Sequence, residues 1–272
     1  MYLLGWIIAQ ALASLKFKIQ FLDTSLTGTI VSLLLFVIVL PYWARIRWRM
    51  NRPWDTLGVS SLSVSRSIFL FWKGFSQAFL LILLIALILL ITGRTSLEFN
   101  LDFPLFLNAV LLCIGVGFAE ELIFRGWLLS EFSYSIGPKK SILLQSLIFS
   151  LVHIRLDLGL LNLISLLIGL FLLGLVLAIK RVIDRGSLWG CIGLHGGFVG
   201  IWFLFTSSFL NISYPAPFWL LGPGNYSPNP IGGIIGIVSL IILLYIQLIS
   251  LETGSITSLF GTVNASSKVA EP

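Results

Sequence analysis

The stretch that decides the fold is FPLFLNAVLLCIGVGFAEELIFRGWLL, residues 103–129. It is mostly apolar and longer than the roughly 20 residues that one membrane crossing needs. Near its end it nevertheless carries Glu120, Glu121 and Arg125. Holding an ionised group in hydrocarbon is costly, so three such groups in one apolar helix indicate a functional site.

The rest of the chain is equally apolar. Of its 272 residues, 57% are hydrophobic and 10% are charged, whereas about a quarter of the residues of a soluble domain are charged. This composition excludes an ordinary soluble domain and indicates a multi-pass protein surrounded by a lipid bilayer. The net charge of +6 does not indicate a nucleic-acid partner, because the basic residues cluster in short loops and form no stripe.

Seven stretches are apolar enough to cross a membrane, which predicts an all-α transmembrane helix bundle. They are Leu26–Ala44, Ile68–Thr92, Phe103–Leu129, Ser141–His153, Leu158–Ile179, Ser187–Leu210 and Ile231–Leu251. The fourth is the shortest. A further hydrophobic segment, residues 1–15, lacks the basic start of a signal peptide and is short for a span, so we expect an uncleaved interfacial or partly inserted helix.

The sequence shows no internal repeat and no soluble segment, so we expect one membrane-embedded domain over residues 1–252. The polar residues 253–272 predict a disordered cytoplasmic tail. Alternating spans would bring three basic loops to one face, and this face is expected to be cytoplasmic. The loops contain Arg45, Arg47, Arg49, Arg52, Arg66, Lys139, Lys140, Lys180, Arg181 and Arg185. The membrane is a plasma membrane or an organellar one.

The chain has two cysteines, Cys113 and Cys191, and both fall within apolar stretches. This position predicts free thiols and no disulfide framework.

The two glutamates are expected to do different work. Glu121 and Arg125 are four residues apart, so they share one face of a helix and can form a pair. Glu120 points about 100° away from Glu121. We therefore expect Arg125 to hold Glu121, and Glu120 to face a cavity as a general base.

The only two histidines, His153 and His195, also lie in apolar stretches. Counting 1.5 Å per helical residue from the basic loops places Glu120 and both histidines about 12 to 20 Å deep. Four glycines surround His195, at positions 193, 196, 197 and 200. They allow either close packing of this helix against its neighbours or room for a substrate backbone.

Glu120-Glu121-x-x-x-Arg125, followed by Phe149-x-x-x-His153 and then His195, resembles the motifs of the CPBP family, the CAAX proteases and bacteriocin-processing enzymes. This family, also called Abi, includes the type II CAAX prenyl endopeptidases. The resemblance covers about residues 103–210.

This resemblance implies an intramembrane endopeptidase of the glutamate type. Glu120 and His153 would activate a water molecule, and His195 would help to stabilise the oxyanion. Glu121 and Arg125 would be the supporting pair. The substrate would be a membrane-associated peptide or protein, prenylated in the CAAX endopeptidases.

One residue departs from the family pattern. The family usually has Asn or Asp four residues after the second histidine, where this chain has Val199. Loss of one oxyanion donor typically lowers the rate by a factor of about 100 to 1,000. Trp202 is a full turn further on and offers no obvious replacement.

Two alternatives stay open. Zinc could be held by Glu120, Glu121, His153 and His195, although no His-Glu-x-x-His helix is present and Arg125 would oppose a dication. We favour a site without a metal or other cofactor. The chain could also be a non-catalytic membrane scaffold or immunity protein of the same fold. A proton-coupled transporter is disfavoured, because the sequence shows no internal repeat.

Overall fold

The structure is a computed structural model that describes residues 10, 24–213, 218–224 and 228–253. The predicted helix at residues 1–15 and the predicted tail at 253–272 lie outside the described residues, apart from Gln10 and Thr253. The chain divides into two compact units, residues 1–56 and residues 57–272. The first unit contains α2 (Thr24–Trp48) and the short α3 (Pro53–Thr56).

The second unit is helical apart from two short strands. Its α-helices and strands are α4 (Val64–Ile91), β1 (Thr95–Leu97), α5 (Phe103–Leu111), α6 (Gly117–Glu121), α7 (Leu129–Ile136), α8 (Pro138–Leu151), α9 (Leu160–Ile183), α10 (Trp189–Leu204), β2 (Leu210–Ile212), α11 (Phe218–Leu221) and α12 (Ile234–Thr253). Its π-helical segments are η1 (Leu112–Val116), η2 (Leu122–Leu128) and η4 (Phe205–Phe209). Two short 3₁₀ turns are η3 (Leu156–Leu158) and η5 (Pro230–Gly232).

Within the described residues, six helices are long and apolar enough to cross a membrane. They are Gly28–Trp48, Val64–Ile91, Phe103–Ile136, Leu160–Ile183, Trp189–Phe209 and Ile234–Glu252. The predicted all-α membrane bundle is therefore confirmed. The remaining predicted span is α8, which has only 14 residues and is about 21 Å long at 1.5 Å per residue.

The long helix Phe103–Ile136, called here the glutamate helix, joins α5, η1, α6, η2 and α7. At its start the Asp102 carboxylate accepts a hydrogen bond of 2.7 Å from the backbone N–H of Leu105, and Pro104 occupies the first turn. Both features favour a helix start. The two π-helical segments η1 and η2 flank the glutamates, and such segments often occur at functional sites.

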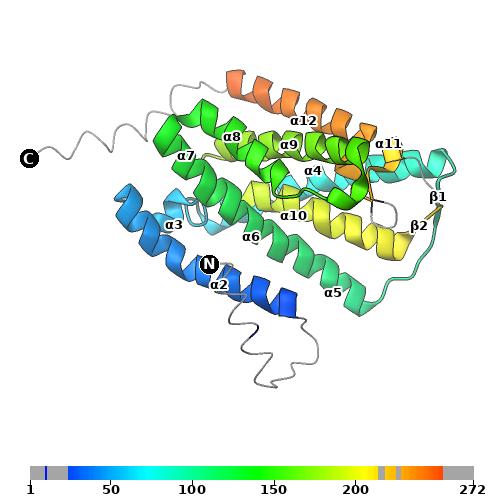
Figure 1. Ribbon diagram of the computed structural model, residues 1–272, viewed down its shortest axis with the longest axis horizontal. Helices are drawn as coiled ribbons and strands as arrows, with labels where there is room; N and C mark the ends of the chain where they lie inside the picture. The colour runs from blue at the N-terminus through cyan, green and yellow to red at the C-terminus, as the bar shows by residue number, and fades with distance from the viewer. Residues whose placement is uncertain (1–9, 11–23, 214–217, 225–227, 254–272) are drawn as a thin grey trace, which may run out of the picture. The chain divides into compact units, whose positions relative to one another are not determined.

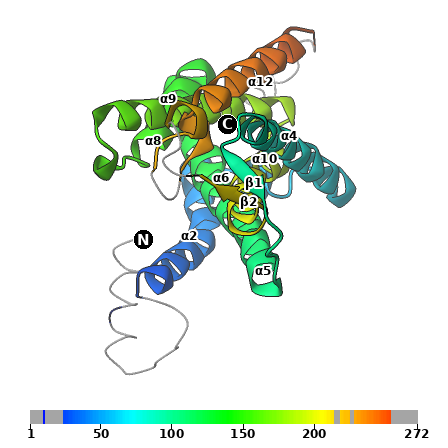
Figure 2. The same ribbon diagram turned by 90° about the vertical axis from the view of Figure 1, so that its right-hand side faces the viewer.

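Helix α10 lies at the centre of the second unit, between α4 and the glutamate helix (Figures 1 and 2). Its glycines permit this position. A Cβ at Gly193 would collide with the carbonyl oxygen of Phe71 in α4, and one at Gly196 would collide with that of Cys113 in η1. Close packing on both sides of α10 therefore accounts for these glycines.

A small sheet closes one end of this unit. Strands β1 and β2 pair antiparallel, with Ser96 opposite Asn211, and α11 lies at the same end in Figure 1. The turn between α7 and α8 lies at the opposite end. Cys113 and Cys191 are both buried and free, as the sequence predicted.

Two of the basic residues that we assigned to a loop are buried. Lys180 is 3% exposed and forms an ion pair of 3.4 Å with buried Asp184. Arg181 is 8% exposed. Both belong to the last turn of α9 and turn inward. Unlike solvent-exposed basic residues in a loop, they therefore do not indicate which side of the membrane is cytoplasmic.

Candidate active site

Glu121 forms the buried half of the site. Its carboxylate oxygen Oε1 accepts hydrogen bonds of 2.7 Å from Arg125 Nη1 and 2.7 Å from His195 Nδ1. The side chains of Glu121 and Arg125 are both 0% exposed. Because Arg125 and Glu121 are four residues apart on one helix and His195 comes from α10, this contact fixes the glutamate helix against α10.

Glu120 forms the open half. Its oxygen Oε2 lies 3.5 Å from Nε2 of His153 and 3.9 Å from Nε2 of His195. The Glu120 side chain is 27% exposed and that of His153 is 32% exposed. These separations are longer than typical hydrogen bonds, and Oε2 itself is buried and has no hydrogen-bond partner.

The ring nitrogens of both histidines have defined roles. His153 Nδ1 lies 2.7 Å from the carbonyl oxygen of Phe149, which can only accept, so Nδ1 carries a proton. His195 Nδ1 donates to Glu121, whose charge Arg125 balances. In the neutral rings each Nε2 is then an acceptor facing the Glu120 carboxylate, so a hydrogen-bond donor is required among these three atoms.

Phe149 connects the two halves of the site. Its ring stacks edge-on to His195 with centroids 5.7 Å apart, and lies 4.8 Å from the ring of His153. The guanidinium carbon of Arg125 lies 4.1 Å from the Phe149 centroid, within the range of a cation–π contact. The sequence identified Phe149 as part of a motif but gave no sign of this shared contact.

Arg181 supports the site from behind, and the sequence analysis missed this role. Its Nη1 donates to the backbone carbonyl of Arg125 and, over 3.0 Å, to the Ser130 hydroxyl. Arg125 lies within η2, where the π-helical turn alters the normal carbonyl pairing. The buried guanidinium therefore satisfies a backbone group of the segment that positions Arg125. The sequence shows only two adjacent basic residues at the end of a span. Such a pair is equally typical of a solvent-exposed loop, so it did not indicate a buried supporting role.

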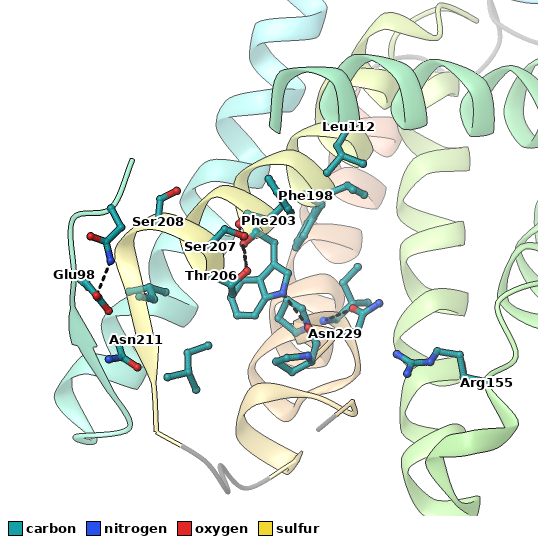
Figure 3. Close-up of a pocket in the computed structure, with 18 residues that line it drawn as sticks. Glu98, Leu112, Arg155, Phe198, Phe203, Thr206, Ser207, Ser208, Asn211 and Asn229 are labelled. Carbon is teal, nitrogen blue, oxygen red and sulfur yellow. Dashed lines mark hydrogen bonds between the residues drawn. The ribbon is translucent and has the colours of Figure 1, made fainter. Parts of the chain in front are cut away.

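A cavity of about 840 Å³ opens beside this cluster, toward the β1–β2 end (Figure 3). Glu120 and the histidines are not part of its lining. However, Val199 lies one turn beyond His195, and Arg155 is two residues after His153, and both line the cavity. A bound chain in the cavity could thus reach the cluster.

Val199 is half-buried at this wall and carries no hydrogen-bond donor. Trp202, which also lines the cavity, already donates its indole N–H to the carbonyl of Pro228 over 2.9 Å. Among the described residues near His195, neither of these side chains replaces the expected Asn or Asp.

Within the described residues, no three His, Cys, Asp or Glu side chains are placed to hold one metal ion. Glu121, one of the four candidate ligands for zinc, is already bonded to Arg125 and His195 through Oε1.

Two family models match the chain. Residues 102–201 match the model described as type II CAAX prenyl endopeptidase, Rce1-like, and residues 1–52 match a domain of unknown function, DUF8676. Neither the comparison with curated proteins nor that with solved structures gives a match. The first matched segment contains Glu120, Glu121, Arg125, His153 and His195.

Proposed function

We propose, from the match of residues 102–201 to the model of Rce1-like type II CAAX prenyl endopeptidases, that the protein is an intramembrane peptidase using Glu120 as its general base. The substrate is a membrane-associated peptide or protein. The observation that carries this proposal is the convergence of Glu120 Oε2 with both Nε2 atoms, within 3.9 Å, beside a cavity.

The buried Oε2 of Glu120 has no hydrogen-bond partner, and a water molecule that bridges it to the imidazole nitrogens would supply the missing donor. Glu120, assisted by His153, takes one proton from the water while the oxygen attacks the scissile carbonyl carbon. When the C–N bond breaks, the proton passes to the departing amine. The second proton of the water leaves the new carboxyl group and is also taken up by the amine, so the products are a carboxylate and an ammonium group, and atoms and charge balance.

His195 is placed to stabilise the oxyanion. Its Nδ1 already donates to Glu121, so Nε2 can donate to an oxyanion only when both ring nitrogens carry protons. The Glu121 carboxylate accepts the hydrogen bond from Nδ1 and so fixes the orientation of the ring. Arg125 and Glu121 thereby act as supporting residues.

The test is cleavage of a library of prenylated and unprenylated membrane-anchored peptides by the purified protein in detergent. We expect cleavage by the parent protein and none by Glu120→Ala. Equal behaviour of the two proteins, with the variant still functional in cells, would instead support the non-catalytic scaffold. Val199 is the observation that favours this second function.

We propose that the reaction needs no metal. A chelator should therefore leave cleavage unchanged. Inhibition by the chelator that added zinc reverses would assign the metal-dependent alternative, with zinc held by Glu120 and the histidines.

We also propose that the cavity opens on the side opposite the cytoplasm. Exposed Lys139 and Lys140 begin α8, and exposed Arg185 follows α9, at the end away from the sheet. Positive residues of this kind favour the cytoplasmic side, which would also hold the end of α12. A cysteine introduced at Asn211 should be labelled by a membrane-impermeant reagent added to the outside of intact cells, and labelling only after lysis would reverse this orientation.

A further inference from the structure

The end of helix α2 carries a dense block of positive charge. Residues 45–54 read RIRWRMNRPW, and the arginines among them are Arg45, Arg47, Arg49 and Arg52. Residues 24–54 contain no acidic residue. The block lies at the end of Gly28–Trp48, a helix long and apolar enough to cross a membrane. The arginines are therefore expected at the level where hydrocarbon gives way to lipid headgroups.

The arginines are exposed, whereas a tryptophan between them is buried. Arg45, Arg49 and Arg52 are all exposed. Trp48 is 6% exposed, and its ring packs edge-on against Trp43 with centroids 5.3 Å apart. The buried tryptophan thus fixes the end of the helix from which the arginines project.

The protein does not neutralise this charge. Within residues 24–56 the only carboxylate is Asp55, which lies 3.8 Å from Arg52. The side chain of Arg52 is 86% exposed, and an exposed pair of this length is weak. Arg47 already takes part in another interaction, but neither Arg45 nor Arg49 pairs with a residue that the structure describes. Their guanidinium donors are available to a ligand.

The backbone of Arg49 is a second, independent observation. Its φ is 53°, in the left-handed region, directly after the end of α2. Glycine or asparagine usually occupies such a position, because a long side chain is strained there. Among the described residues, only Arg49 and Arg185 combine a side chain with a positive φ. A strained residue on an exposed surface suggests that its side chain has a use.

Orientation in the membrane is the simpler explanation of the charge. It requires only positive residues next to a span, and lysine serves as well as arginine. It explains neither a block built from arginine alone nor the left-handed Arg49. A phosphate ligand explains the choice of arginine, because the planar guanidinium donates two parallel hydrogen bonds to phosphate oxygens, whereas an ammonium group acts as a point charge.

We propose that Arg45, Arg49 and Arg52 form a binding surface for the phosphate groups of anionic phospholipids. The ligand is a lipid and not a soluble anion, because the block adjoins a membrane span and so lies beside the headgroups. Zwitterionic lipids also carry a phosphate, but their ammonium group offsets its charge, so the surface should select lipids with a net negative headgroup. This proposal does not depend on the peptidase function.

The experiment is native mass spectrometry of the full-length protein in detergent, titrated with phosphatidylglycerol or with phosphatidylcholine of the same acyl chains. The parent protein should retain phosphatidylglycerol more tightly. One arginine near an anionic headgroup contributes about fivefold in affinity. Each single change, Arg45→Gln, Arg49→Gln or Arg52→Gln, should therefore reduce the preference about fivefold, and the triple variant should reduce it roughly 100-fold. The single variants keep the test decisive if the triple variant inserts in the wrong orientation.

A glycine substitution separates lipid binding from backbone strain. Arg49→Gly should raise the midpoint of thermal unfolding in lipid-free detergent, because glycine adopts a positive φ without strain. It should also weaken phosphatidylglycerol binding. Arg185→Gly is the matched control, because this exposed arginine has a φ of 55° but its basic neighbours Lys180 and Arg181 are buried. It should raise the midpoint and leave the lipid preference unchanged.

Equal retention of the two lipids by the parent protein would overturn the proposal. An unchanged preference in the three single variants would overturn it as well, and so would the same loss of preference in Arg185→Gly as in Arg49→Gly.

Discussion

Glu120 and Glu121 are neighbours in the chain, but their surroundings differ. Around Glu121 the hydrogen bonds are 2.7 Å long and the carboxylate is fully buried. Around Glu120 the nearest imidazole nitrogens lie 3.5 and 3.9 Å away, and a quarter of the side chain is open. The protein supplies both hydrogen-bond partners of Glu121 Oε1, whereas Glu120 Oε2, which faces the two imidazoles, has none. The comparison shows that Glu121 holds the helices of the site together and that Glu120 is available for chemistry.

The largest expected effect follows from removing the open carboxylate. Glu120→Gln keeps the size of the side chain but cannot accept a proton, so cleavage should fall by about 100- to 10,000-fold. Thermal unfolding in detergent should stay unchanged. Glu131→Gln, on the same long helix but away from the histidines, is the control and should keep full activity. If both variants lost activity equally, Glu120 would have no special role.

A substitution in the buried half of the site, unlike one at Glu120, is expected to lower the stability of the protein. Arg125→Met leaves the Glu121 carboxylate buried without its cation, and breaking a buried ion pair typically costs about 3 to 5 kcal/mol. The free energy of unfolding, measured by denaturant titration in mixed micelles, should fall by this amount. Exposed Arg94→Met should change it little. An unfolding free energy within 1 kcal/mol of the parent value would show that the pair is not structural.

A smaller effect is expected where α10 meets the glutamate helix. Alanine at Gly196 would collide with the backbone of Cys113, and such overpacking costs about 1 to 3 kcal/mol. Alanine at Gly115 meets nothing within 4 Å, so Gly115→Ala is the matched control on the glutamate helix. Because His195 lies on α10, Gly196→Ala should also lower kcat. Equal stability of the two alanine variants would contradict the close packing.

The smallest expected effect is a gain. Val199→Asn places an amide one turn beyond His195, where the family pattern has a donor. Since loss of such a donor costs about 100- to 1,000-fold, partial recovery should raise kcat by roughly tenfold without changing KM. If the parent protein is active and Val199→Asn does not raise kcat, then the oxyanion is stabilised by groups other than the side chain at position 199.

Much of this architecture was predictable from the sequence. Apolar length identified six of the seven predicted spans as helices long enough to cross a membrane, and the match of residues 102–201 confirms the family resemblance. The spacing of four residues predicted the pairing of Glu121 with Arg125, while the catalytic roles of the site residues stay predictions. The inward turn of Lys180 and Arg181 was not predictable, because hydropathy does not report which way a charge at a helix end points. Nor were the π-helical segments or the shared ring of Phe149, which depend on packing between distant helices.

The shortness of α8 has a consequence for the surrounding lipid. A bilayer core is about 30 Å thick, so a helix of about 21 Å leaves some 9 Å unspanned. Beyond its end the chain carries His153, Arg155 and Asp157, which hydrocarbon would not tolerate. A span as short as α8 would require the membrane to thin at this side of the protein or to admit solvent there. That depression would supply the hydrolytic water and let a polar chain end approach without crossing the full apolar layer.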